Sequence, residues 1–154
     1  MRGQCFITMT KFRNTVTKFS RESQLLEPVA RFAKRKGFYL QSAELPFYEY
    51  RIDLYGFSHK RDATIAVELK LNDWRRALEQ TMLYQLCADL VYIAMPERSA
   101  MRVDKAELES NGIGLIAVRD SGNCACVLLA KPHDEVRQVY RLSQINYLKG
   151  MAYV

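Results

Sequence analysis

The fold of this chain is decided by residues 51–71, RIDLYGFSHKRDATIAVELKL. Strand-type residues fill both ends of this stretch, and the polar segment SHKRD lies between them. Upstream, the residues YLQSAELPFYEY extend the first run with the same strand-type composition. Alternating runs joined by a short polar turn are typical of a β-hairpin. The stretch therefore predicts two antiparallel strands with their turn at residues 58–62.

The register of this hairpin brings acidic residues together. A turn centred between Lys60 and Arg61 places Asp53 directly opposite Glu68 on the neighbouring strand. Paired strand residues have Cβ atoms about 5 Å apart, so two carboxylates at these positions repel each other. Because strand side chains alternate between faces, Lys70 shares a face with Glu68. We therefore expect two carboxylates and one ammonium group to lie side by side.

This arrangement suits metal-assisted chemistry on a phosphodiester. Two carboxylates, Asp53 and Glu68, match Mg²⁺ or Mn²⁺, which keep several waters and take one or two carboxylates plus substrate phosphate. Such an ion acidifies water and neutralises charge on a phosphate, and Lys70 is placed to orient that water. Charges within apolar strands are costly unless they bind something. A Glu-x-Lys pattern alone equally allows an exposed, salt-bridged sheet face, and that alternative stays open.

A helix is expected before the hairpin. Ser20 is a plausible N-cap, apolar residues then recur at helical spacing, and Gly37 ends the helix. Glu22 lies one turn before Leu25, which places it on the buried face as a third acid near the sheet. The same residue equally fits a capping role for free N–H groups at the helix start.

A second helix follows the hairpin, from about Trp74 to Cys87, with Asn72 or Asp73 as its cap. Gln80 and Tyr84 are separated by one helical turn on the inward face, where they can support a site; a tyrosine at the core edge is the plainer interpretation. At the start of this helix, Trp74, Arg75 and Arg76 are candidate nucleic-acid contacts through stacking and charge, although a tryptophan is equally suited to the core.

The rest of the chain alternates between strands and helices. Expected elements are a buried central strand LVYIAM, a helix over residues 102–110, strands GLIAV and CACVLLA, and a last helix from Asp134 to Lys149. The sequence therefore predicts one α/β domain over residues 20–154, a central mixed β-sheet flanked by helices. Residues 1–19 form a basic N-terminal arm.

Charge and composition narrow the function classes. Residues 1–40 hold nine Lys and Arg against two Glu, a net charge of +7, so the other 114 residues are close to neutral. A basic segment attracts polyanions, although a solvated helix face explains it as well. The four cysteines lack metal-binding spacing and are interpreted as free thiols of a cytoplasmic protein. No apolar run is long enough for a membrane span, and no nucleotide-binding glycine loop occurs.

In these residues the sequence resembles the restriction-endonuclease-like nucleases of the PD-(D/E)xK superfamily. The resemblance covers roughly residues 20–95: an acid in the first helix, Ile52-Asp53, Glu68-Leu69-Lys70 after 14 intervening residues, and Gln80-x-x-x-Tyr84. Ile52 stands where these families have proline. The resemblance implies an αβββαβ core, Asp53 and Glu68 as metal ligands, and Lys70 beside the attacking water. Glu22 is then an auxiliary acid, and Gln80 and Tyr84 a supporting pair similar to that of RecB-type nucleases.

Three functions follow as hypotheses. The first is a Mg²⁺- or Mn²⁺-dependent nuclease of DNA repair, recombination or a mobile element, acting on DNA or RNA, with a homodimer left open. The second is a catalytically inactive nuclease-like module that binds nucleic acid or protein. The third is a small accessory protein whose Glu-x-Lys strand is only surface.

Overall fold

The computed structural model describes residues 18–134 and 136–152. Its elements, in chain order, are η1 (Glu22–Leu25), α2 (Leu26–Arg35), β1 (Leu40–Phe47), β2 (Tyr50–Ser58), β3 (Ala63–Leu69), α3 (Trp74–Tyr84), β4 (Leu90–Pro96), α4 (Glu97–Ala100), α5 (Lys105–Ser110), β5 (Gly114–Val118), β6 (Cys124–Leu128) and α6 (Gln138–Ala152). Within this part of the chain, no helix combines the length and apolar character that crossing a membrane requires.

The six strands form one mixed sheet in the order β1-β2-β3-β4-β5-β6. β1, β2 and β3 are antiparallel neighbours, β3, β4 and β5 run parallel, and β6 returns antiparallel to β5. Every residue of β4 is buried, which confirms the central position predicted from LVYIAM. The expected α/β class is correct, and the chain does follow the order helix, three strands, helix, strand.

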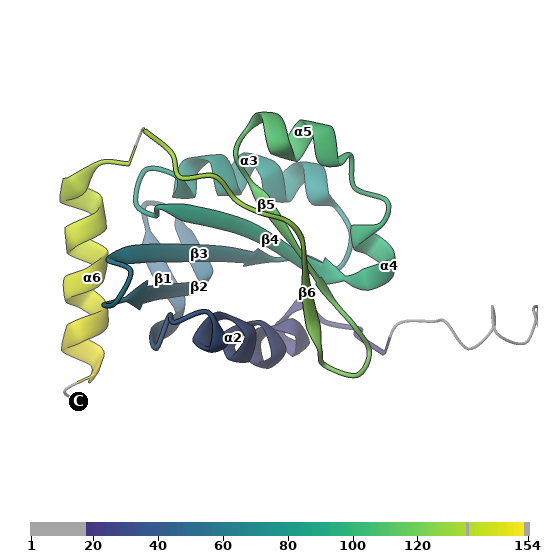
Figure 1. The fold of residues 1–154 in the computed structure, drawn as a ribbon, viewed down its shortest axis with the longest axis horizontal. Helices are drawn as coiled ribbons and strands as arrows, with labels where there is room; N and C mark the ends of the chain where they lie inside the picture. The colour runs from purple at the N-terminus through teal and green to yellow at the C-terminus, as the bar shows by residue number, and fades with distance from the viewer. Residues whose placement is uncertain (1–17, 135, 153–154) are drawn as a thin grey trace, which may run out of the picture.

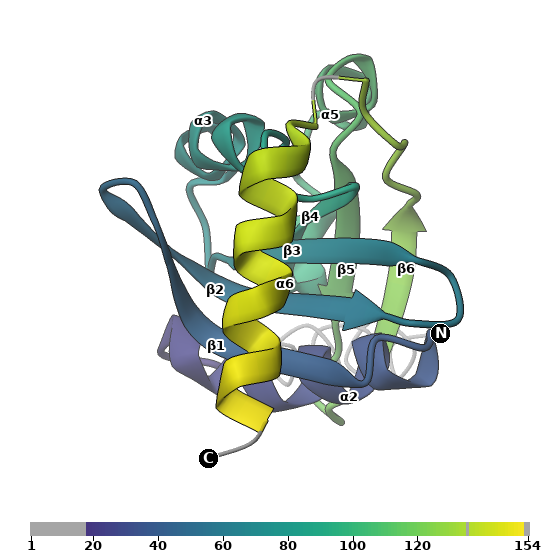
Figure 2. The same ribbon diagram turned by 90° about the vertical axis from the view of Figure 1, so that its left-hand side faces the viewer.

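Helices cover both faces of the sheet (Figure 1). η1 and α2 pack on one face, where Leu25 and Val29 belong to one apolar cluster with the strand residues Leu54 and Val67. α3 and α5 lie on the opposite face, and α6 crosses the sheet near β1 (Figure 2). Two apolar clusters, one on each face, therefore hold the sheet rigid between them.

The first helix begins later than predicted. Ser20 is not its N-cap: the backbone N–H of Ser20 donates to Oε1 of Gln24 at 2.7 Å, and Arg21 occupies the cap of η1. The side chain of Gln24 thus reaches back and accepts hydrogen bonds from the backbone N–H groups of Ser20 and Arg21, ahead of the helix start. Gly37 ends α2 as expected, with φ +100°, a conformation that residues with a Cβ rarely adopt.

The folded domain begins earlier than residue 20, where the sequence predicts the end of the basic N-terminal arm. Phe19 is buried with the α2 cluster, and the backbone N–H of Lys18 donates to Asp120 at 3.2 Å. The folded domain therefore includes at least residues 18 and 19. The rest of the predicted basic arm lies outside the described residues.

The strand-type segment before residue 58 is two strands rather than one. β1 and β2 form a hairpin that turns at Tyr48 and Glu49, and Tyr48 has φ +54°. The composition of this segment is strand-like throughout, and its turn lacks the glycine, asparagine or proline that usually marks one. Pairing of β2 with β3 begins only at Leu54, so the tip of the β1–β2 hairpin extends beyond the sheet body (Figure 2).

Three helix boundaries differ from the sequence prediction. α3 starts at Trp74 with Asp73 as its cap but ends at Tyr84, before Cys87. The predicted helix over residues 102–110 is α5, which starts only after Asp104, and the short α4 has no counterpart among the predicted elements. Asp134 does not cap α6, which begins at Gln138. A turn follows α3 at residues 85–87, and turns precede α5 and α6, so periodicity alone does not mark where helix and turn meet.

A buried ion network fixes α6 to the sheet. Arg141 is only 7% exposed, and its guanidinium donates to Asp89 at 3.0 Å and to the backbone carbonyl of Asp62 at 2.8 Å. Asp89 also accepts from the backbone N–H and the hydroxyl of Thr64. Because a buried charge is tolerated when it is paired and hydrogen-bonded, this network places α6 in one defined position on the sheet.

The described cysteines are free thiols, as expected: Cys87 is buried, Cys124 half-buried and Cys126 exposed. Cys5 lies outside the described residues. Burial raises the pKa of the Cys87 thiol to about 12. Cys87 is therefore a core residue rather than a nucleophile.

Candidate active site

The predicted hairpin register is correct. Leu54 pairs with Val67, and Tyr55 pairs with Ala66. The same register, extended by one residue, places Asp53 opposite Glu68. On the other side of β2, Glu44 of β1 lies opposite Asp53 but takes a left-handed conformation, φ +51°, and drops out of the strand pairing. Asp53 therefore lies where β2 and β3 separate, beside a single unpaired position of the otherwise continuous β1–β2 pairing.

Asp53 is half-buried and held by one backbone donor. Its Oδ2 accepts the N–H of Leu69 at 2.8 Å, so β3 itself fixes the carboxylate. Burial raises the pKa of Asp53; the Leu69 N–H lowers it, and the nearby Glu22 carboxylate raises it further. Without a cation, this site therefore disfavours the charged form of Asp53.

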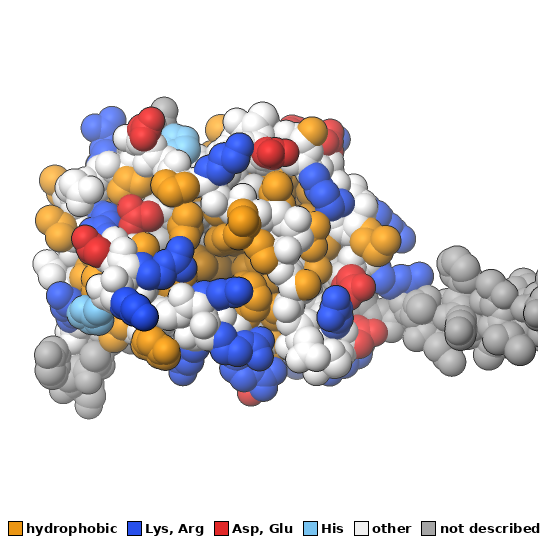
Figure 3. All heavy atoms as spheres, in the orientation of Figure 1, with side chains coloured by type: hydrophobic (Ala, Val, Ile, Leu, Met, Phe, Trp, Pro, Cys, Tyr) orange, Lys and Arg blue, Asp and Glu red, His pale blue; other side chains and the backbone are white. Residues whose placement is uncertain are grey.

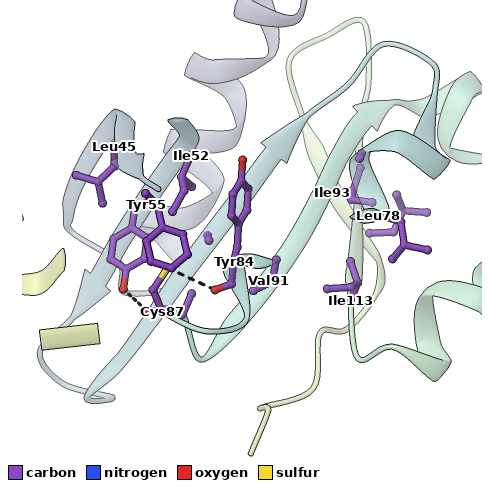
Figure 4. Packing of buried hydrophobic residues seen from close by; sticks show 14 of the residues in the cluster. Leu45, Ile52, Tyr55, Leu78, Tyr84, Cys87, Val91, Ile93 and Ile113 are labelled. Carbon is purple, nitrogen blue, oxygen red and sulfur yellow. Dashed lines mark hydrogen bonds between the residues drawn. The ribbon is translucent and has the colours of Figure 1, made fainter. Parts of the chain in front are cut away.

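Glu68 is the most buried acid of the group, 5% exposed. Its Oε2 accepts the phenol hydroxyl of Tyr84 at 2.9 Å. Tyr84 lies in the buried cluster beneath α3, close to Ile52 and Val91 (Figure 4). Burial and then the Asp53 charge raise the pKa of Glu68 to about 8, against the opposing effects of Tyr84 and Lys70. Two adjacent acids thus both resist ionisation.

Lys70 follows β3 directly and is the cation nearest these acids. Its side chain is 16% exposed, and its Nζ lies 3.9 Å from Oε1 of Glu22. The prediction that Glu22 lies on a buried helix face is wrong, because Glu22 starts the 3₁₀ turn η1 and its side chain is 47% exposed. Glu22 nevertheless reaches the site, where it positions the ammonium group of Lys70.

Gln80 lies one helical turn before Tyr84 on α3. Its Oε1 is buried and, among the described residues, has no hydrogen-bond partner. A buried carbonyl oxygen without a donor costs about 1–3 kcal/mol, so a ligand or ordered water is expected beside it. Contacts and charges link five of the predicted residues (Glu22, Asp53, Glu68, Lys70 and Tyr84), and Gln80 lies on the helix that supplies Tyr84.

The structure gives the residues at the start of α3 other contacts. Trp74 packs partly buried against the core, and the Arg75 guanidinium lies 4.5 Å from the centre of its ring. Arg75 also forms an ion pair with Glu107 at 3.4 Å. Arg76 is exposed. Arg75 is thus held by its neighbours, and contact of these three residues with nucleic acid stays a prediction.

The residues present fit a divalent cation with few protein ligands. Across residues 18–134 and 136–152, no three His, Cys, Asp or Glu side chains are grouped as a metal site. Asp53 and Glu68 alone supply two carboxylates, the number that Mg²⁺ accepts when waters and substrate phosphate fill its other positions. Burial raises the pKa of both acids, the Asp53 charge adds to this effect at Glu68, and a bound cation would oppose it.

Sequence reasoning misses the contribution of the β1–β2 hairpin. The Tyr84 hydroxyl lies 3.4 Å from the backbone carbonyl of Arg51, so the hairpin borders the site. A backbone contact has no signal in the side-chain pattern. The turn at Tyr48 is hidden as well, because the composition of residues 39–57 is typical of one continuous strand.

Comparison with known proteins finds a similar fold. No protein-family profile and no curated protein matches the chain. A solved structure of a protein of unknown function from Silicibacter pomeroyi is similar, with a TM-score of 0.65 and 23% identity over 86% of this chain and 87% of that one. This likeness shows a shared fold.

Proposed function

We propose that the chain is a metal-dependent nuclease that hydrolyses phosphodiester bonds of DNA at the Asp53–Glu68 pair. The observation that carries the proposal is this pair of adjacent acids, half-buried and buried, with Lys70 beside them. A structural role gives no reason to keep two such acids together, because their repulsion and burial both cost free energy. Binding of a cation and a phosphate would explain why the two acids lie together.

The cation would be Mg²⁺ or Mn²⁺, held by Asp53 and Glu68. When bound, it supplies positive charge to the scissile phosphate and lowers the pKa of water. The chain itself holds the two carboxylates in place: the Leu69 N–H donates to one oxygen of Asp53, and the Tyr84 hydroxyl donates to one oxygen of Glu68. Lys70, held by Glu22, orients the attacking water and stabilises charge on the phosphate.

Basic side chains provide an approach for a polyanion. Arg31, Lys34, Arg35 and the following Lys36 of α2 are all exposed. Figure 3 shows Lys and Arg side chains gathered over α2 and around a hollow with hydrophobic walls. Such charge raises the local concentration of nucleic acid and makes binding depend on salt.

Purified protein should cleave DNA when Mg²⁺ or Mn²⁺ is added and should stop when EDTA removes the metal. The assay uses supercoiled plasmid, linear duplex and end-labelled single-stranded DNA, with products separated on gels. Lys70→Ala should lower the rate about 10²-fold or more, because it removes a positive charge that acts on both Asp53 and Glu68. Cleavage that persists in EDTA, or no cleavage of any of the three substrates, contradicts the proposal.

The raised pKa of Glu68, about 8, supports a second candidate. An acid that stays protonated at neutral pH suits a module that binds nucleic acid without cutting it. That candidate predicts DNA affinity in EDTA that is unchanged by Mg²⁺. The logarithm of its binding constant should fall with the logarithm of salt concentration by about 0.9 per phosphate contacted.

A further inference from the structure

A pocket lies between the tip of the β1–β2 hairpin and α6, outside the acidic site. Its volume is about 310 Å³, and its walls are aromatic: Phe47 and Tyr48 from the hairpin, Tyr140 and Tyr147 from α6. This volume is at the lower end of the range for small-molecule sites. The pocket is thus of a size to take one planar group at a time.

The aromatic walls are rigid on one side and open on the other. Phe47, Tyr48 and Tyr140 pack edge to face, with ring centres 4.8–5.7 Å apart, and the Tyr48 and Tyr140 hydroxyls share a hydrogen bond. Tyr48 and Tyr147 remain 61% and 48% exposed. Exposed tyrosines beside a fixed aromatic cluster offer faces on which a flat ring can stack.

Polar groups lie among these rings. Gln144 is 8% exposed and donates from Nε2 to the carbonyl of Pro46 at 3.1 Å. Gln144 and Ser143 both line the pocket, so it has polar side chains able to hydrogen-bond the edge of a base.

The pocket and the acidic site both contact one cross-strand pair of the β1–β2 hairpin, Pro46 and Arg51. Tyr84, which donates to Glu68, also contacts the carbonyl of Arg51. Arg51 pairs with Pro46, and Pro46 both lines the pocket and accepts from Gln144. In Figure 2 the hairpin projects past α6, which crosses beside it. A strand cut at the acids is therefore placed to pass over the hairpin and reach the pocket.

The charges around the pocket favour an anionic chain. Arg51 is exposed on the hairpin, where its ion-pair partner is the equally exposed Glu44 at 4.0 Å, a pair that a phosphate can replace. Arg137, just before α6, acts electrostatically on Tyr48. We propose that the pocket stacks an unpaired base of a nucleic-acid strand, with Arg51 and Arg137 contacting its phosphates. This inference rests on the proposed nuclease function and narrows its substrate to nucleic acid with a single-stranded segment beside the cut.

The test measures binding in EDTA, so that cleavage does not interfere. A fluorescein-labelled single-stranded DNA is compared, by anisotropy, with an abasic strand of equal length and charge. Wild-type protein should bind the base-containing strand about 5- to 100-fold more tightly, since base–aromatic stacking has this size. Tyr48→Ala and Tyr147→Ala should bind both strands equally.

Two controls separate stacking from unfolding. Tyr147→Phe keeps the ring and should retain the preference for bases, and Tyr39→Ala, at a tyrosine that is 75% exposed and does not line the pocket, should change nothing. Circular dichroism should give all variants the melting temperature of wild type within a few degrees.

Equal wild-type affinity for the two strands overturns the inference, even if Mg²⁺-dependent cleavage is intact. Conversely, a base preference lost in Tyr147→Ala, in a protein that never cleaves, supports the pocket and rejects only the nuclease function. A dimer that Tyr147→Ala dissociates, seen by sedimentation without any base preference, assigns the pocket to a second copy of this chain and also overturns the inference.

Discussion

Replacing Asp53 with asparagine is expected to reduce Mg²⁺-dependent DNA cleavage by about 10²- to 10³-fold or more. Asparagine keeps the size of the side chain and an oxygen that can accept the Leu69 N–H, but it removes the charge that would hold the cation. Loss of one electrostatic group at a reacting centre typically costs this much. The measurement is the initial rate of strand cleavage at saturating Mg²⁺.

The same variant should fold at least as stably as wild type. Burial and the neighbouring Glu22 already oppose ionisation of Asp53, so a neutral residue removes an unfavourable charge. The matched control is Asp134→Asn, at an exposed aspartate, and its cleavage rate should not change. An Asp53→Asn protein that cleaves like wild type removes the acidic pair from the reaction.

The stability of the metal-free protein should fall as pH rises, and Glu68→Gln should remove most of this effect. The pKa of Glu68 is about 8 in the folded protein and near 4.5 when unfolded. Between these values the folded state holds a proton that the unfolded state has lost, so folding is favoured below pH 4.5 and loses this advantage as pH approaches 8. Asp53 has a pKa raised in the same direction.

The slope is limited to about 1.4 kcal/mol per pH unit for one proton. From pH 5.5 to 7.5 the free energy of unfolding should drop by about 2 kcal/mol, which lowers the melting temperature by roughly 4–8 °C. Thermal denaturation in EDTA at a series of pH values measures this change in melting temperature. Glu79→Gln, at an exposed residue of α3, should keep the wild-type slope. A slope of wild-type size in Glu68→Gln contradicts the assigned environment.

The sequence alone is sufficient to predict the centre of the fold because local rules govern it. The β2–β3 turn fixes a register, and a register fixes which side chains face each other. The hairpin pattern therefore brings Asp53, Glu68 and Lys70 together without any long-range information. Tyr84 follows from helical spacing, although α3 ends earlier than predicted.

What the sequence cannot predict depends on distant or unusual contacts. The chain starts its helical segment as the 3₁₀ turn η1, which places Glu22 on an exposed turn instead of the expected buried helix face. The turn at Tyr48 lacks the residues that usually mark a hairpin. The position of α6 rests on Arg141 reaching Asp89, 52 residues away in the chain. Neither that helix position nor the pocket it forms has a local pattern.

The most direct test of the central claim is a crystal of this protein soaked in millimolar Mn²⁺. Data collected for the anomalous signal of manganese locate the ion independently of any activity. A single peak is expected between the carboxylates of Asp53 and Glu68, and it should be absent in crystals of Asp53→Asn. If no peak lies between these two side chains at millimolar Mn²⁺, or if the variant shows an equal peak, Asp53 and Glu68 do not form the proposed metal site.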